Sequence, residues 1–173
     1  MIDPLDNQCM PDLLIALRVQ NKPLENNEIQ SCNYWIADSE RAFVKAKIIS
    51  EEGSSVLLET DDKQLLVPRY ALSRANASRF EMCEDNANLP ELSEATVLEN
   101  LLQRYRKNLI YTNSGLFLIA INPYQHFPGY YDDSIMRIYS KNATNLPPHI
   151  FGIVDKAYKS MLAEGKSQSI LIT

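Results

Sequence analysis

Residues 93–123 read SEATVLENLLQRYRKNLIYTNSGLFLIAINP, and this stretch decides the fold of the chain. Its first half predicts a helix, because Ser93 can cap the start, Glu94 lies in the first turn and basic residues gather near the end. Apolar side chains recur at helical spacing, with Val97, Leu101 and Tyr105 in one stripe and Leu98 and Leu102 beside it. We therefore expect an amphipathic helix over residues 94–108.

The second half of the stretch predicts a β-hairpin. Two apolar, β-rich runs, LIYT and LFLIAI, are joined by the polar link Asn113, Ser114 and Gly115. A short link with a glycine between such runs is typical of a hairpin. LFLIAI lacks polar alternation, so we expect this strand to be buried on both faces, as a central strand of something larger than a hairpin.

Upstream of the helix, residues 33–68 contain short β-type runs separated by charged turns. The runs are YWIA, AFVKAKII, SSVLLET and QLLVP, and they follow one another at roughly ten-residue spacing, as in small all-β domains. The alternation in AFVKAKII favours a small antiparallel barrel or curled sheet. We expect Trp35, Phe43, Val56 and Leu58 to fill its core, with Trp35 as core filler rather than as a ring that stacks on a ligand.

The composition along the chain predicts four segments and the fold class α+β. Residues 1–30 are rich in proline, asparagine and acidic side chains, which is typical of a flexible leader. Residues 31–78 form the predicted barrel. Residues 79–92 are acidic and proline-marked, so they are interpreted as a linker. Residues 93–173 hold the helix, the hairpin and all that follows.

Downstream of the hairpin, the loop NPYQHFPGYY leads to two further predicted helices. A short helix fits DDSIMRIYSK, and a longer one starts near Pro147 and Pro148 and runs until Gly165. QSILIT then predicts a new strand, and the sequence ends at Thr173 within this apolar run.

The charge and the cysteines exclude several classes of protein. The 173 residues include 17 basic and 22 acidic side chains, a net charge of −5, and no basic tract suits nucleic acid or anionic lipid. The three cysteines form no C-x-x-C pair, so neither a disulfide framework nor a zinc site is predicted. The N-terminus does not resemble a signal peptide, and no run approaches the ~20 apolar residues of a membrane span. We expect a cytosolic protein that binds neither nucleic acid nor membrane.

Two patterns that could carry chemistry are better explained without it. Gly165, Lys166 and Ser167 match the end of a phosphate-binding loop. Such a loop needs a strand before it and a helix after it, whereas the expected order here is reversed, so we expect a polar turn. His126 and His149 lack a neighbouring carboxylate or thiol pattern, so neither a metal site nor a catalytic residue is predicted.

Four blocks of the sequence together carry a resemblance to a known family. They are SGLFLIAINPY, the N-P-x-x-x-x-x-x-Y spacing from Asn122 to Tyr130, PPHIF from Pro147 to Phe151, and QSILIT from Gln168 to Thr173. In this order and spacing they resemble the start of the motor head of a myosin heavy chain, most closely of the conventional two-headed class. The resemblance covers residues 33–173. In that family a small Src-homology-three-like barrel precedes an α/β P-loop motor domain, which agrees with the barrel expected here.

The resemblance implies a function and a site. The parent protein would be an actin-activated ATPase, a cytoplasmic motor of the cytoskeleton that uses ATP and Mg²⁺ and has actin filaments and light chains as partners. The N-P-x-x-x-x-x-x-Y loop would lie at the purine end of the ATP site. Asn122, Pro123 and Tyr130 would then contact or frame adenine, and His126 would lie beside the base or ribose. Without the resemblance, NPYQHFPGYY predicts only a solvated turn.

The resemblance also implies what this chain alone would not do. In the family, the strand that matches QSILIT runs into the phosphate loop, so that loop, the Mg²⁺ ligands and the actin-binding parts would follow Thr173. We therefore expect an N-terminal fragment of a motor, which binds ATP weakly and does not hydrolyse it. The alternative is a non-catalytic, stand-alone interaction module that uses the barrel and the helices as a binding surface. The apolar end of the sequence favours the fragment.

Overall fold

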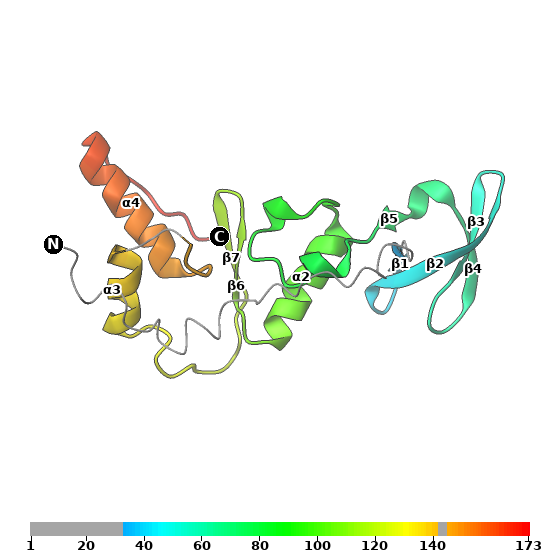
Figure 1. Cartoon of the computed structure of the whole chain (residues 1–173), viewed down its shortest axis with the longest axis horizontal. Coiled ribbons are helices and arrows are strands. Elements are labelled where there is room, and N and C mark those ends of the chain that lie inside the picture. The colour runs from blue at the N-terminus through cyan, green and yellow to red at the C-terminus, as the bar shows by residue number, and fades with distance from the viewer. Residues whose placement is uncertain (1–32, 142–144) are drawn as a thin grey trace.

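The structure, a computed structural model, describes residues 33–141 and 145–173 (Figure 1). A β-sheet unit lies at one end, a helix in the middle, and a hairpin followed by two helices at the other end. The strands and helices are largely segregated along the chain, so the expected α+β class is confirmed. The predicted leader, residues 1–30, lies outside the described residues.

Five antiparallel strands form the first unit. They are β1 (Asn33–Asp38), β2 (Ala42–Glu52), β3 (Ser55–Glu59), β4 (Gln64–Pro68) and β5 (Ser73–Arg74), in the order β4-β3-β2-β1-β5. The long β2 pairs with both β1 and β3, and a register shift between Ile48 and Ser50 interrupts the second pairing. The four expected strands are confirmed. The sequence did not predict β5, because two residues are too few to show a period.

The core of this sheet differs in part from the expectation. Its buried residues are Ile36, Val44, Ala46, Val56 and Leu58. Val56 and Leu58 are thus confirmed as core, but the placement of Trp35 and Phe43 there is wrong. Trp35 lies opposite Lys45 and Phe43 opposite Ala37, which puts both on the outer face of the sheet because side chains alternate along a strand. Trp35 is only 7% exposed, since residues beyond the barrel cover it.

Helix α2 (Glu94–Arg106) is capped as expected. Ser93 Oγ accepts the N–H of Thr96 at 3.3 Å, and Ser93 N–H donates to Thr96 Oγ1 at 2.9 Å, a reciprocal cap that fixes the first turn. The buried side chains of α2 are Ala95, Thr96, Asn100 and Arg104. Leu98 and Leu102, in contrast, are 44% and 39% exposed. The helix therefore buries a largely polar face, while Val97, Leu101 and Tyr105 of the expected stripe are half-buried.

The segment between the barrel and α2 explains why that face is polar. It contains the short 3₁₀ turns η4 (Ser78–Phe80) and η5 (Asn86–Asn88), whereas a third such turn, η3 (Arg69–Ala71), links β4 to β5 within the barrel. Asn100 Nδ2 donates to the carbonyl of Cys83 at 2.9 Å and to Oδ1 of Asn86 at 2.8 Å. Irregular backbone leaves carbonyl groups without a partner, and polar side chains of α2 satisfy them. The division of the chain at residues 78 and 92 remains a prediction.

A two-stranded hairpin follows α2. Strand β6 (Tyr111–Ser114) pairs with β7 (Phe117–Ala120), and Ser114 pairs with Phe117, so the turn consists of Gly115 and Leu116. Gly115 has φ +62°, where glycine carries no steric cost. The hairpin is confirmed, but the expectation that its second strand is buried on both faces is wrong for the part of the chain that the structure describes. Phe117 is 74% exposed, because within that part β7 has only β6 beside it.

Two helices complete the chain as expected, but the last strand is absent. They are α3 (Asp133–Lys141) and α4 (Ile150–Glu164), and Gly165 ends α4 in the left-handed conformation. Residues 166–173 are extended and exposed and form no strand. The expected strand is wrong here, since a strand requires a partner backbone to bond with. Among the described residues, no helix has the length and apolar character needed to cross a membrane.

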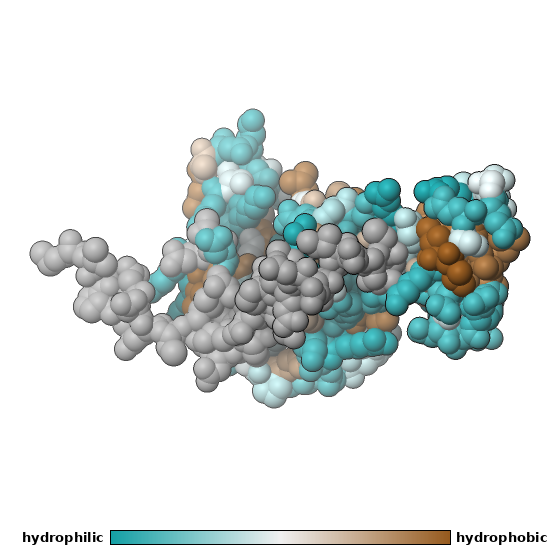
Figure 2. Space-filling view, turned by 45° about the vertical axis from the view of Figure 1, so that its right-hand side comes forward, coloured by the Kyte–Doolittle hydropathy of each residue, from teal (hydrophilic) through white to brown (hydrophobic). Residues whose placement is uncertain are grey.

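Apolar side chains reach the surface in several parts of the molecule. Figure 2 shows apolar areas on the barrel among hydrophilic ones, and Ile49 and Leu66 of the barrel are 47% and 60% exposed. On α4, Val154, Tyr158 and Leu162 are 46%, 56% and 63% exposed. Their spacing places these three on one side of the helix, so α4 has an uncovered apolar face.

Candidate functional site

The loop with the N-P-x-x-x-x-x-x-Y spacing connects β7 to α3. Its start is fixed by backbone and side-chain hydrogen bonds. Ile121 N–H donates to the carbonyl of Ile110 at 3.0 Å, and Asn122 Oδ1 accepts the N–H of Tyr124 at 2.8 Å. The second bond forms a tight Asx turn, which gives the amide of Asn122 a defined orientation.

The structure divides the expected site residues into two groups. Asn122 and His126 are exposed and Pro123 is half-buried, so all three are accessible from solvent. Tyr130 is only 2% exposed. Its ring therefore belongs to the interior of the molecule, and the structure does not bring it together with the other three on an accessible surface.

Tyr130 is held by a cluster of aromatic rings. Its ring centroid lies 5.6 Å from that of Phe127, 5.2 Å from Tyr131, 6.1 Å from Tyr111 and 5.1 Å from His149. Burial raises the pKa of Tyr130 to about 12, so the hydroxyl is neutral at physiological pH. The far end of the loop is thus anchored by packing, whereas its start is anchored by hydrogen bonds.

Two neighbouring tyrosines, which the sequence did not single out, extend this cluster. The hydroxyl groups of Tyr111 and Tyr131 are 2.9 Å apart and form a hydrogen bond. Burial, followed by this bond, raises the pKa of Tyr111. Tyr131 remains 51% exposed, so one ring of the cluster is accessible from outside. These contacts join β6 to the end of the loop, a tertiary relation that no local pattern shows.

His149 lies at the centre of the same cluster, in a role that the sequence did not suggest. It is 2% exposed and precedes the first turn of α4, where its Nδ1 accepts the N–H of Phe151 at 3.1 Å. Burial lowers the pKa of His149 to about 4, while the backbone of Tyr130 acts weakly in the opposite direction. The ring is therefore neutral at pH 7. The sequence predicted that this helix starts near Pro147 and Pro148, so it did not show that His149 caps the helix, which begins at Ile150.

Arg104 is bonded to the backbone of Tyr111, one member of the cluster. Its Nε donates to Thr112 Oγ1, one terminal nitrogen to the carbonyl of Met82 and the other to the carbonyl of Tyr111, each at 2.8 Å. The side chain is 1% exposed. Burial lowers the pKa of Arg104, and the charge of Glu84 opposes this shift. One guanidinium thus ties α2, β6 and the segment before α2 together, and the sequence placed it only in a basic helix end.

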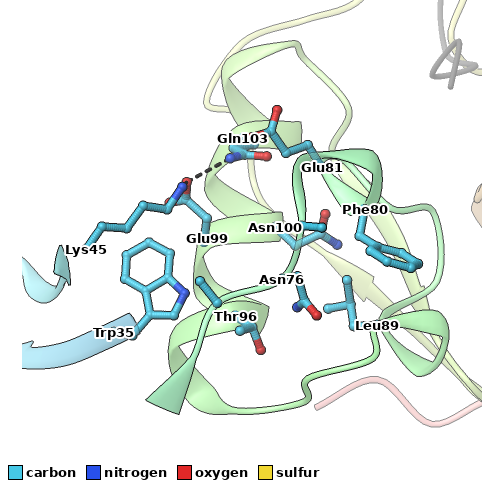
Figure 3. A pocket seen from close by; sticks show the side chains of 12 residues that line it. Trp35, Lys45, Asn76, Phe80, Glu81, Leu89, Thr96, Glu99, Asn100 and Gln103 are labelled. Atoms are coloured by element: carbon cyan, nitrogen blue, oxygen red, sulfur yellow. Dashed lines mark hydrogen bonds and ion pairs between the residues drawn. The ribbon is translucent and has the colours of Figure 1, made fainter. Parts of the chain in front are cut away.

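A small groove between the barrel and α2 is a second candidate site (Figure 3). Trp35 and Lys45 approach it from the barrel, and Glu99 and Gln103 lie on α2. Lys45 Nζ lies 5.1 Å from the centre of the Trp35 ring and 3.4 Å from Glu99 Oε1, which also accepts Gln103 Nε2 at 2.7 Å. Lys45 and Glu99 are thus paired with one another, and their contacts join the barrel to α2.

The phosphate-loop match and a metal site, the remaining candidates, find no support among the residues that the structure describes. Gly165, Lys166 and Ser167 form a turn in which Gly165 N–H donates to the carbonyl of Met161 at 3.0 Å, and no helix follows it. The expected polar turn is confirmed. In residues 33–141 and 145–173, no group of three or more His, Cys, Asp or Glu side chains could hold a metal ion.

Two family models match the chain. Residues 83–173 match the myosin head (motor domain), and residues 31–76 match the myosin N-terminal SH3-like domain. The second match confirms the Src-homology-three-like barrel that the resemblance implied. Together, the two matched regions include the barrel, α2, the hairpin, the loop with Asn122 and both later helices.

Several curated proteins are similar to most of the chain. Myosin type-2 heavy chain 2 of Schizosaccharomyces pombe is 46% identical over 141 residues, which cover 80% of this chain and 7% of that protein. Myosin-3 of Caenorhabditis elegans is 42% identical over 142 residues, 82% of this chain and 7% of that protein. Myosin-1 of the same organism is 37% identical over 157 residues, which cover 89% of this chain and 8% of that protein. The chain thus spans less than a tenth of the length of these relatives.

Proposed function

The chain belongs to the myosin family, and on this premise we propose that it forms the first part of an actin-based, ATP-driven motor and supplies the purine end of the ATP site. The match of the head model to residues 83–173, more than half of the chain, carries the proposal. The loop from Asn122 to Tyr130 lies within that match. A stand-alone interaction module is not favoured, because both the barrel and the following region match myosin models.

In this proposal the exposed part of the loop contacts the base. Asn122, Pro123 and His126 are accessible, and the Asx turn with Tyr124 holds the Asn122 amide in one orientation. An amide with a fixed direction suits the polar edge of a purine. Tyr130 frames the site from the interior, because only 2% of its surface is exposed and its ring anchors the loop.

The phosphate end of ATP and the Mg²⁺ ion would be held by other parts of the motor. The turn at residues 165–167 is not followed by a helix, so it lacks the N-terminal N–H groups that bind phosphate. We therefore expect the 173 residues alone to be inactive as an ATPase. Actin filaments and light chains would also bind elsewhere in a cytoskeletal motor, and we propose no nucleic-acid or membrane partner.

The purine role is tested at Asn122 in a complete head that carries this sequence. Asn122→Ala removes both the amide and the Asx turn. We expect about a tenfold higher KM for ATP with kcat within about twofold, because base contacts are shared by ground and transition states. Asn122→Asp keeps an oxygen that accepts the Tyr124 N–H but has no amide N–H to offer the base. It separates loss of the turn from loss of recognition.

Each result has a defined meaning for the proposal. If both variants raise KM, the amide itself recognises the base. If only Asn122→Ala raises KM, Asn122 shapes the loop and the contact to the base must come from Pro123 or His126. A KM for ATP equal to that of the unaltered head in both variants would show that the loop is not the purine site.

A further inference from the structure

We propose that His149 is a positioning residue, which sets where Tyr130 and the end of the loop lie through its ring contacts. The inference rests on the proposed role of this loop in the nucleotide site. It assigns the order of the loop to a residue on a different element, the start of α4.

The first observation is the number of rings that meet at His149. The distances between ring centroids are 4.7 Å to Phe151, 5.1 Å to Tyr130, 5.2 Å to Tyr111, 5.2 Å to Tyr139 and 5.6 Å to Tyr131. These partners come from β6, the loop, α3 and α4. Tyr139 is also fixed, since its hydroxyl donates to the carbonyl of Pro147 at 2.7 Å. The imidazole therefore contacts more rings of this cluster than Phe151, which also reaches the loop through Tyr131.

The second observation is that the backbone hydrogen bonds at the end of the loop are local. The N–H of Tyr130 donates to the carbonyl of Phe127 at 3.2 Å, and the N–H of Asp132 to the carbonyl of Gly129 at 3.3 Å. Both bonds are long and local, so they shape the turn without fixing it to the rest of the molecule. The packing of the Tyr130 ring provides that attachment, together with the hydrogen bond between the hydroxyl groups of Tyr131 and Tyr111.

The third observation separates two roles within one side chain. Nδ1 accepts the Phe151 N–H and caps α4, which places the proton of the neutral ring on Nε2. Nε2 is buried and has no hydrogen-bond partner at normal distance among the described residues, although the backbone of Tyr130 lies close enough to oppose the fall in the pKa of the ring. The contact with Tyr130 thus depends on the shape and faces of the ring, whereas the cap depends on Nδ1. The two roles can be removed one at a time.

Two substitutions make this separation in the 173-residue chain. His149→Phe keeps a ring of similar size but has no acceptor for the Phe151 N–H. His149→Asn keeps a side-chain oxygen that can cap the helix but has no ring. Phe151→Leu is the control, because Phe151 contacts His149 and Tyr131 but is not among the rings packed against Tyr130. Hydrogen exchange of single backbone amides, followed by NMR, reads out each variant.

The proposal predicts opposite patterns for the two variants. In His149→Asn, the amides of Tyr130 and Asp132 should exchange about tenfold faster, with that of Phe151 little changed. In His149→Phe, the Phe151 amide should exchange about tenfold faster, with Tyr130 and Asp132 within about threefold of the unaltered chain. Phe151→Leu should leave the Tyr130 amide within the same threefold limit.

A purely structural role would not give this crossed pattern. Equal loss of protection at Tyr130 in both His149 variants would overturn the proposal. The amide of Asn113, which bonds to the carbonyl of Glu84, reports whether a variant stays folded. If His149→Asn unfolds, His149→Phe still tests the proposal. A folded His149→Phe chain in which the Tyr130 amide has lost its protection would contradict it.

Failure of this inference can be told apart from failure of the proposed function. The exchange pattern requires no nucleotide, whereas the Asn122 variants test ATP recognition directly. If the Asn122 variants change KM while the two His149 variants exchange alike, only the positioning role is wrong. In a complete head, His149→Asn should raise KM for ATP about as much as Asn122→Ala, and His149→Phe should leave it within about twofold.

Discussion

The barrel and the region around the hairpin are both small antiparallel sheets, but they are stabilised in different ways. In the barrel, Val56 and Leu58 are 1% and 0% exposed and pack within the sheet itself. Behind the hairpin, the most deeply buried side chains are polar, with Arg104 and Thr112 each 1% exposed, while Phe117 of β7 is 74% exposed.

This difference arises because the two sheets differ in how many backbone hydrogen bonds they form and in how much apolar surface they bury. In a five-stranded sheet the three inner strands have a partner on each side, and this sheet buries an apolar core of its own. A two-stranded hairpin has neither, so it depends on elements packed against it. Arg104 and the aromatic cluster around His149 provide that support in the described part of the chain.

The largest expected effect is at the centre of the hairpin region. Arg104→Met removes three hydrogen bonds and leaves the carbonyls of Met82 and Tyr111 buried without a donor. We expect the free energy of unfolding of this region to fall by about 4 kcal/mol. Hydrogen exchange should show lost protection in α2 and β6, with the barrel unchanged.

A matched substitution in the barrel core should have the opposite pattern, with lost protection in the barrel and an unchanged hairpin region. Leu58→Ala leaves a cavity in the barrel core and should cost about 3 kcal/mol, with loss of protection in β2 and β3 only. Arg104→Lys keeps the charge but not the planar fork of donors, so an intermediate loss is expected. If either substitution unfolded both regions together, the barrel and the hairpin region would form one cooperative unit.

A change of pH should affect the hairpin region by a smaller amount. Burial lowers the pKa of His149 from 6.5 to about 4, so between these values the unfolded chain binds a proton that the folded chain does not. The free energy of unfolding should therefore be highest above pH 6.5 and fall as the pH drops to about 4, by on the order of 3 kcal/mol. Burial also raises the pKa values of Tyr111, Tyr130 and Tyr139, which stay neutral throughout this range.

Denaturant titrations of the 173-residue chain at several pH values measure this slope. His149→Phe has no titrating ring and should flatten the dependence between pH 6.5 and 4 for α4 and the hairpin. A slope that persists in His149→Phe would assign the proton uptake to other groups.

The smallest expected effect is at the groove between the two regions. Lys45→Met removes the ion pair with Glu99 and the cation over the Trp35 ring, both of which are partly exposed to solvent. The cost should be about 0.5–1 kcal/mol. Trp35 is the single tryptophan of the chain, so its fluorescence reports this contact directly. A red-shifted emission is expected in Lys45→Met, and no shift in Lys47→Met, which lies further along the same strand.

The sequence alone determined the local elements and the family. Alternating apolar residues predicted four strands of the barrel, Ser93 predicted the start of α2, and Gly165 predicted the end of α4. The order and spacing of four motifs predicted a myosin head, which the family models confirm. These features depend on neighbours in the chain or on motifs, and both can be read without knowing which surfaces meet.

Only the tertiary structure decided which faces are buried. The period of α2 shows that Val97, Leu101 and Tyr105 form one stripe and that Asn100 and Arg104 lie along its edge. It does not show that the buried side is the polar one. That outcome depends on carbonyl groups of residues 82, 83 and 111, which need donors and reach α2 only when the chain has folded. The same holds for Trp35, Tyr130 and His149, whose environments are built from elements far apart in the sequence, because burial is a property of the assembled surfaces and not of the residue type.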